Sequence, residues 1–402
     1  MSEKRIYLDY AATTPVDLSV WNLFQQISLN NWANPSGMHT DSQRARFILE
    51  QSRRSVAEII QVKNPNNIVF TSSATEANNL AIKGLLDTYI SQGQIPHILI
   101  SSIEHDCVLE ASHSRGDRAL VGEIPVSSEG VINIENVASL IKPETKLISV
   151  MLVNNEIGTV QPIKDLSNML YEMNQDRLRA GEPAILLHVD ASQAPLYFEV
   201  SVNELGCDLL TLSGHKIYGI KGSACLYISN SVSIVPQTLG GKQEHGLRSG
   251  TVNVAAAAAM AEALKKAQNN YQQEFSSAIQ KRDYLKLELE KMMNELGIMD
   301  RYRINGSWEY RSPANLNFSL KGFDHQTVLT ALDIAGISVS GGSSCSSGSE
   351  EISHVIRNIN QDTDWLEKMA TIRVSLGLET TRDELDLFVA RLYKILNSLN
   401  QN

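Results

Sequence analysis

The sequence predicts an α/β protein with a large, mostly parallel sheet covered by helices and a smaller α/β unit near the C-terminus. Between about residues 65 and 230, short apolar runs alternate with amphipathic segments, the pattern of a parallel sheet. A long helical stretch, residues 252–296, separates this region from a second, shorter set of strands. Because the 402 residues exceed one typical domain, we expect a large domain of residues 16–265. A small domain would comprise residues 266–402 together with residues 1–15.

Apolar runs locate the strands of the large domain, with a helix over residues 76–86 after the first. The runs are residues 67–70, 97–100, 147–152, 184–189, 209–212 and 224–228. Parallel sheets bind ligands at the carboxyl ends of their strands. The polar residues that follow these runs therefore form the candidate site: residues 71–75, His105, Asn154, Asn155, Asp190 and Lys216.

The small domain is expected to hold three strands, residues 315–320, 337–340 and 371–376, with a helix over residues 326–334. Thr381 and Glu384 have the spacing of a capping box, which predicts a last helix over residues 383–399.

Composition narrows the class of protein. With 43% hydrophobic and 20% charged residues, the chain is typical of a globular protein. A net charge of −10 argues against a nucleic-acid binder, and no apolar stretch is long enough to span a membrane. The four cysteines form no CxxC pair, so neither a zinc site nor a disulfide framework is expected. With no apolar signal region at the start, a reducing cytoplasm fits best.

Lys216 is the most informative single residue. It follows the apolar run 209–212, within the turn Ser213-Gly214-His215-Lys216. A lysine that ends a strand in a turn can face a cavity, lose its proton and form a Schiff base with pyridoxal phosphate (PLP). A solvated surface lysine is the ordinary alternative and would be favoured for Lys216 alone. The neighbouring motifs reverse that preference.

Three further groups have both a functional and a structural explanation. Ser72-Ser73-Ala74-Thr75 opens a helix whose free N–H groups could hold a phosphate, although ordinary capping is the alternative. Asp190 could keep the pyridine nitrogen of PLP protonated, or could be a cap or a loop ion pair. His105 could stack on the cofactor ring, or could be structural.

The small domain contributes two candidates. Arg373 lies inside an apolar strand, where an unpaired charge is costly, so we expect a carboxylate partner from the protein or from a substrate. Cys345 lies in a segment of Ser and Gly, residues 340–349, that has no apolar surface to bury it. A thiol exposed in a flexible segment could carry a group to an outside acceptor; an incidental loop cysteine is the alternative.

Eight motifs occur in a characteristic order. They are YLDYAATTP (7–15), ANPS (33–36), SATE (73–76), VNNEIG (153–158), HVDASQ (188–193), SGHK (213–216), LRSGT (247–251) and the Cys345 segment. In this order they resemble the NifS/IscS-type cysteine desulfurases, within the class V PLP-dependent aminotransferases. Each motif alone is weak, whereas eight in order are specific. The resemblance implies the PLP-dependent transferase fold of the aspartate aminotransferase type.

The resemblance also implies roles for the matching residues. The catalytic residues would be Lys216 for the Schiff base, Cys345 to take the sulfur and His105 over the ring. Asp190 would pair with the pyridine nitrogen and Gln193 would face the phenolic oxygen. The phosphate would lie among Ala74, Thr75, Ser213, His215 and, from a second subunit, Thr251. Asn155 and Arg373 would bind the substrate carboxylate, and no metal would be involved.

The implied activity is that of an L-cysteine desulfurase, which converts L-cysteine to L-alanine and a persulfide on Cys345. A homodimer is implied, together with a sulfur-acceptor or scaffold protein in iron–sulfur, thio-cofactor or tRNA-thiolation pathways. The alternatives are a selenocysteine lyase, an aminotransferase or a catalytically silent scaffold of the same fold. The chain departs from the usual family pattern at Ile220, at residues 350–352 and at Leu378.

Overall fold

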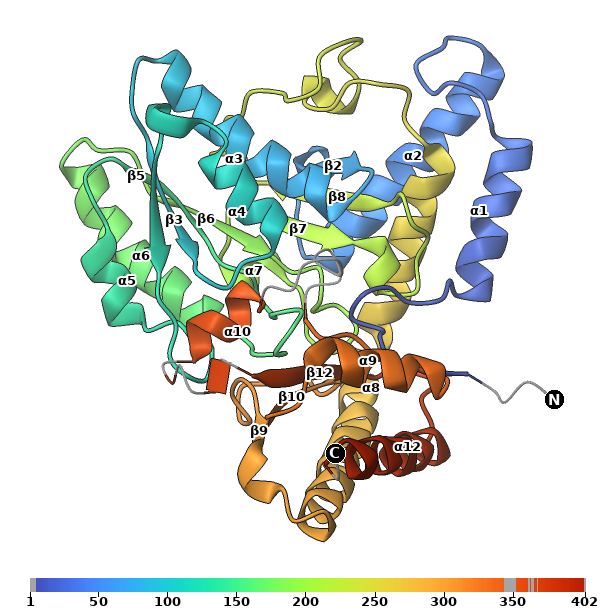
Figure 1. Cartoon of the computed structure of the whole chain (residues 1–402). Helices are drawn as coiled ribbons and strands as arrows, with labels where there is room; N and C mark the ends of the chain where they lie inside the picture. The colour runs from blue at the N-terminus through green and yellow to red at the C-terminus, as the bar shows by residue number, and fades with distance from the viewer. Residues whose placement is uncertain (1–4, 343–351, 361, 363–364, 367, 401–402) are drawn as a thin grey trace.

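The computed structural model describes residues 5–342, 352–360, 362, 365–366 and 368–400, and within these ranges a seven-stranded sheet forms the larger part (Figure 1). Its order is β2-β8-β7-β6-β5-β3-β4. The bounds are Ile68–Thr71 (β2), His97–Ser101 (β3), Leu120–Ile124 (β4), Thr145–Ser149 (β5), Leu186–Asp190 (β6), Leu209–Ser213 (β7) and Ala224–Ile228 (β8). Strands β4, β3, β5, β6 and β7 run parallel, and β8 is antiparallel to both of its neighbours. The predicted α/β class with a mostly parallel sheet is confirmed.

Helices cover both faces of this sheet, which explains why its inner strands, β3, β5, β6, β7 and β8, are buried along their whole length. Alternate residues face opposite ways: Ile98 and Ile100 belong to the cluster under helices α3 and α4, whereas Leu99 belongs to the main core on the other side. The helices of this part are α1 (Leu18–Asn30), α2 (Thr40–Ile59), α3 (Ala74–Ser91), α4 (Asp106–His113), α5 (Ile134–Leu140), α6 (Ile163–Arg179) and α7 (Val202–Leu205).

Helix α8 (Val254–Glu295) connects this sheet to a smaller unit (Figure 1). There β10 (Asn315–Lys321) pairs with β12 (Met369–Ser375) and β9 (Tyr302–Ile304), all antiparallel, while β1 (Ile6–Tyr7) pairs with β11 (Ile337–Ser338). Its helices are α9 (His325–Ile334), α10 (His354–Ile359) and α12 (Arg382–Asn400). The N-terminal strand thus lies beside C-terminal residues. The division at residue 265 remains a prediction, since α8 passes it without interruption.

Differences from the predicted elements are local. The fifth strand ends at Ser149 instead of residue 152. The sequence reasoning missed β4 because this edge strand is only partly buried and has no continuous apolar run. The capping box is confirmed: the Thr381 N–H donates to Glu384 Oε2 (3.1 Å), and the Glu384 N–H donates to Thr381 Oγ1 (3.3 Å). No helix in the described ranges combines the length and apolar composition needed to cross a bilayer.

Candidate active site

Polar residues gather at one edge of the large sheet. Ala224 pairs with Thr71 on one side and with Ser213 on the other, so the carboxyl ends of β2 and β7 lie at one edge. Asp190 ends β6 beside Thr211 of β7. The sheet therefore brings Asp190 and the Ser213–Lys216 turn together at the edge where parallel sheets bind ligands.

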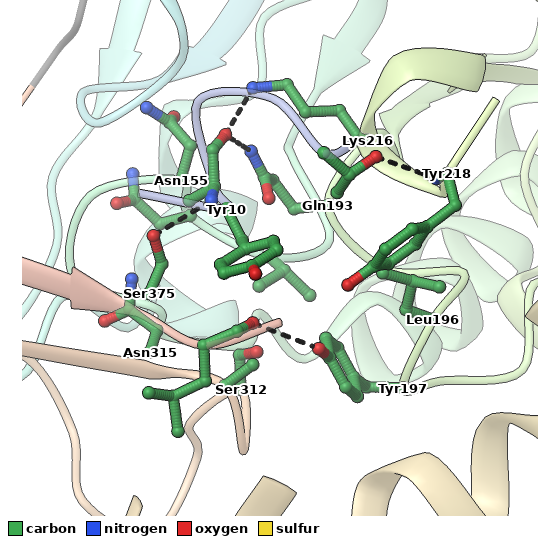
Figure 2. Close-up of a pocket in the computed structure, with 16 residues that line it drawn as sticks. Tyr10, Asn155, Gln193, Leu196, Tyr197, Lys216, Tyr218, Ser312, Asn315 and Ser375 are labelled. Atoms are coloured by element: carbon green, nitrogen blue, oxygen red, sulfur yellow. Dashed lines mark hydrogen bonds between the residues drawn. The ribbon is translucent and has the colours of Figure 1, made fainter. Parts of the chain in front are cut away.

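Lys216 ends the 3₁₀ turn Gly214–Lys216 and points toward the N-terminal segment. Its Nζ donates to the carbonyls of Ala11 and Ala12, the latter at 2.9 Å. Gln193 Nε2 donates to the same Ala11 carbonyl at 2.9 Å. Figure 2 shows Lys216 and Gln193 in a common pocket, which Asn155, Tyr10 and Ser375 also line. Lys216 is therefore a part-buried pocket residue and not a solvated surface lysine.

Asp190 is buried and held by two donors. Asn78 Nδ2 donates to its Oδ2 at 2.7 Å, and the Ser192 N–H donates to its Oδ1 at 2.9 Å. The same Asn78 amide contacts Cys107 Sγ at 3.2 Å. Burial, followed by the charge of Asp190, raises the pKa of Cys107 to about 12, so this thiol stays protonated.

His105 caps helix α4, with its Nδ1 accepting the Cys107 N–H at 3.1 Å. The capping role of His105 is thus observed. His105 is only partly buried, and its role over the cofactor ring stays a prediction. The neighbouring Glu104 is fully buried, and this burial raises the pKa of its carboxyl well above the usual value. Glu104 Oε1 accepts the Met151 N–H at 2.6 Å.

The amino end of α3 lies at the end of β2, with Ala74 as its first residue and Thr75 exposed. Ser73 is the N-cap and accepts the Glu76 N–H at 3.1 Å, so the capping explanation holds for Ser73. The main-chain N–H groups of Ala74 and Thr75 lie in the first turn, where helices bind anions.

The residues present fit PLP. Ser213 Oγ is buried with no hydrogen-bond partner among the described residues, so the site has a polar atom that a phosphate would satisfy. His215 Nδ1 lies 3.2 Å from Thr13 Oγ1. Burial, followed by the charges of Lys216 and Lys221, lowers the pKa of His215 to about 4. His215 is thus a neutral hydrogen-bonding group near pH 7.

Arg373 is buried in β12, and the protein supplies a carboxylate partner. Its Nη2 lies 2.7 Å from Asp9 Oδ1, and its Nη1 donates to the Asn155 carbonyl at 2.9 Å. The two residues predicted to bind a substrate carboxylate, Asn155 and Arg373, are therefore in direct contact.

Two further predicted site residues are Thr251 and Cys345. Thr251 is exposed on the loop before α8, and Cys345 lies outside the described residues. The cysteines of the described part, Cys107, Cys207 and Cys225, are free. Within the described residues no group of three or more His, Cys, Asp or Glu could hold a metal ion.

Sequence reasoning missed the partners of the predicted residues. Asn78 and Glu76 lie on α3, and Asp9 lies in the first motif, where no role was assigned to it. A polar residue on the buried face of α3, such as Asn78, was the available signal, since a buried amide needs a partner. No local pattern pairs Asp9 with Arg373, 364 residues away.

Comparisons with known proteins show the family of this chain. The family model described as Aminotransferase class-V matches residues 6–388. The chain belongs to the class V aminotransferase family. Among its relatives is a protein named cysteine desulfurase IscS from Dictyoglomus turgidum, 36% identical over 398 residues, which cover 99% of this chain and 96% of that protein.

Two solved structures of NifS-related and cysteine-binding proteins are also similar to this class V chain. One is a NifS-like protein with 31% identity and a TM-score of 0.84, covering 98% of this chain and 99% of that one. The other is SspA in complex with cysteine, with 31% identity and a TM-score of 0.74, covering 92% and 98%. The predicted class V family and its fold are therefore confirmed.

Proposed function

We propose that this class V protein is an L-cysteine desulfurase. The observation that carries the proposal is the meeting of Lys216, Gln193 and Asn155 in one pocket, with Arg373 bonded to the Asn155 carbonyl. This pocket offers an amine for covalent chemistry, and the Arg373 guanidinium, which could bind an amino-acid carboxylate, contacts its lining residue Asn155. The relatives named cysteine desulfurase and the cysteine complex of a similar protein support L-cysteine as the substrate.

Arg373 and Asn155 are assigned to the substrate carboxylate. A buried guanidinium forms strong, charge-assisted bonds to a carboxylate. Asp9 and the Asn155 carbonyl already hold two of its nitrogens, so the arginine is oriented before substrate arrives. Pre-orientation of this kind reduces the entropic cost of binding.

PLP is assigned as the cofactor, and when bound it supplies an electron sink for the bonds around the substrate α-carbon. Lys216 would hold it covalently, Asp190 would face its ring nitrogen and Gln193 its phenolic oxygen. Ala74, Thr75, Ser213, His215 and Thr251 would hold the phosphate, with His105 over the ring. Lys216 Nζ is the base that we assign to move the α-proton of the substrate.

Cys345 is assigned as the residue that takes the sulfur. The Cys345 thiolate would attack the sulfur of L-cysteine, forming an S–S bond while the carbon–sulfur bond of the substrate breaks. The substrate carbon gains a proton to give L-alanine, and Cys345 keeps the sulfur as a persulfide. A sulfur-acceptor or scaffold protein would then collect it for iron–sulfur, thio-cofactor or tRNA-thiolation pathways.

We further propose a homodimer. Large apolar side chains are exposed on the first two helices and the segment between them: Leu18, Trp21, Leu29, Trp32, Met38 and Phe47. Exposed apolar clusters of this kind are typical of protein–protein interfaces. Thr251 lies on an exposed loop, as expected of a residue that would reach a neighbouring subunit.

The free thiols of the described part suit a cytoplasmic location.

The test is product analysis of the PLP-loaded protein with L-cysteine and a reductant. Equal amounts of L-alanine and sulfide are expected. Transfer of the amino group to pyruvate without release of sulfide would instead favour an aminotransferase. Release of selenide from selenocysteine, with no sulfide from L-cysteine, would favour a selenocysteine lyase. Failure to bind PLP would leave only the silent-scaffold alternative.

A further inference from the structure

Glu76 of α3 contacts two separate parts of the proposed cofactor site. Its Oε2 accepts the N–H of Ser72 at 2.6 Å and the Ser72 hydroxyl at 2.5 Å, at the amino end of α3. Its Oε1 accepts the Nε–H of Arg248 at 2.8 Å. One carboxylate therefore connects the helix end that carries Ala74 and Thr75 to the loop that carries Thr251.

The contacts of the Glu76 carboxyl favour its charged form. Burial alone would raise the pKa of the carboxyl, but the hydrogen bonds from Arg248 and Ser72 together hold it below the usual value. Both side chains of the pair are about a quarter exposed, at 24% and 23%. The pair is therefore partly shielded from water and from salt screening.

A second ion pair holds the same loop four residues before Arg248. Glu244 forms a bidentate pair with the buried Arg53, at 2.8 and 2.7 Å, and accepts the Phe70 N–H at 2.8 Å. This pair fixes a backbone in which Lys242, Glu244 and His245 all have positive φ angles, of 60°, 46° and 59°. Non-glycine residues adopt this region at a cost that the surrounding contacts must offset.

Thr251 lies three residues after Arg248, the residue of this loop that Glu76 holds. Gly250 has a φ of 113°, a conformation that L side chains rarely adopt. Between Arg248 and Thr251 the chain therefore makes a turn whose direction depends on where Arg248 is held. Two contacts therefore hold the chain just before Thr251: the Glu76–Arg248 pair, and the Gly250 N–H that Gln243 Oε1 accepts at 2.9 Å.

We propose that Glu76 is a positioning residue that acts on two phosphate sites: its own, through Ser72 and the amino end of α3, and the neighbouring subunit's, through Arg248 and Thr251. This inference rests on the proposed function, in which Thr251 serves the second subunit. It adds a residue that touches neither substrate nor cofactor and that couples the two sites of the dimer.

The experiment uses mixed dimers with two different tags. One subunit carries Lys216→Ala, so that borohydride can fix PLP only at the site of its wild-type partner. Adding Glu76→Gln to the Lys216→Ala subunit should weaken PLP binding at the partner's site about tenfold, the effect of losing one hydrogen bond to a charged group. The readout is the fraction of wild-type chains labelled as PLP concentration increases. An unchanged curve would overturn the proposal.

Arg248→Gln provides a second variant that leaves the Glu76–Ser72 bonds in place. In the mixed dimer it should weaken the partner's site as Glu76→Gln does. In the reverse arrangement, with Lys216→Ala on the other subunit, Glu76→Gln should weaken PLP binding at its own site, whereas Arg248→Gln should not. Equal effects of both variants at both sites would indicate a general loss of structure and contradict the assignment.

The matched control is Glu204→Gln, which removes a carboxylate from an exposed pair with Lys164 (2.7 Å). It should leave the labelling curve unchanged. The parent mixed dimer, with Lys216→Ala alone, must label its wild-type chain. Failure of this parent dimer would refute the proposed PLP site, whereas normal labelling with no effect of Glu76→Gln would refute only the positioning role.

Discussion

Arg373 and Asp9 form an ion pair between the two ends of the chain, with Nη2 2.7 Å from Oδ1. The arginine side chain is 1% exposed and the aspartate 19%. Two and three residues after Asp9, the Ala11 and Ala12 carbonyls accept from Lys216. The N-terminal segment therefore connects the proposed carboxylate-binding arginine to the proposed Schiff-base lysine.

Replacing Arg373 with lysine should weaken L-cysteine binding and leave PLP bound. A lysine ammonium is a point charge and cannot serve Asp9, the Asn155 carbonyl and a substrate carboxylate together. We expect KM for L-cysteine to rise about tenfold or more, as for the loss of a charge-assisted bond. Arg179→Lys, in an exposed pair with Asp176, is the control. An unchanged KM in Arg373→Lys would rule out the role.

Borohydride reduction should fix PLP to Lys216, because among the described residues this is the lysine that lines the pocket. The protein should be yellow before reduction. Peptide mass analysis should find the label on Lys216, and Lys216→Ala should abolish it. The exposed Lys221, five residues away, provides the control, since Lys221→Ala should retain the label. Recovery of PLP on any other lysine would contradict the assignment.

Replacing Cys345 with serine should stop sulfur transfer while leaving PLP and L-cysteine binding intact. A serine hydroxyl stays protonated at neutral pH and is a poor nucleophile compared with a thiolate. Sulfide and alanine production should fall at least a hundredfold, by an order-of-magnitude expectation for a lost nucleophile. Cys207→Ala removes a buried core thiol and should keep the activity. Wild-type rates in Cys345→Ser would mean that this thiol is incidental.

Stability should fall as pH decreases from about 6.5 toward 4, in part because of His188. This side chain is fully buried, and burial lowers its pKa to about 4, with Asp190 opposing part of the shift. In this window the unfolded chain binds a proton that the folded chain does not, so the free energy of unfolding decreases by about 1.4 kcal/mol per pH unit for one such group.

His188→Gln should remove this contribution. Urea midpoints measured at pH 7.5 and 5.5 should therefore differ less in His188→Gln than in the wild type, although the variant is less stable at pH 7.5 because His188 bonds Ser149 and Thr211. The control is the same substitution at the exposed His113, His113→Gln, which should leave the pH dependence of the urea midpoint unchanged. A pH dependence equal to that of the wild type would exclude His188 as its source.

The proposed dimer predicts that Trp32→Glu weakens association. Trp32 is 80% exposed in the single chain, and a carboxylate placed in a buried interface would lose its hydration without a partner. Sedimentation velocity should show a dimer for the wild type and a larger monomer fraction for the variant. Tyr171→Glu, on α6 and 68% exposed, should remain dimeric. A monomeric, fully active wild type would refute shared sites.

The sequence by itself determined the elements that local chemistry specifies. Strands β6, β7 and β8 are buried throughout, so each is rich in apolar residues and has no alternating polar face. Thr381 and Glu384 satisfy each other's N–H groups within one turn. Lys216 was identifiable because it follows such a strand in a turn. The order of the motifs identified the family, which the comparisons confirm.

Only the tertiary structure decided which polar groups are partners. Asp9 with Arg373, Asn78 with Asp190, and Glu76 with Arg248 are separated by 364, 112 and 172 residues. A hydrogen bond between such residues leaves no periodic trace in the sequence, because it depends on which strands become neighbours. Sheet order also placed β4 at an edge, where an exposed strand needs no apolar run. Local preferences specify the elements, and long-range packing sets the orientation and charge of the groups at the site.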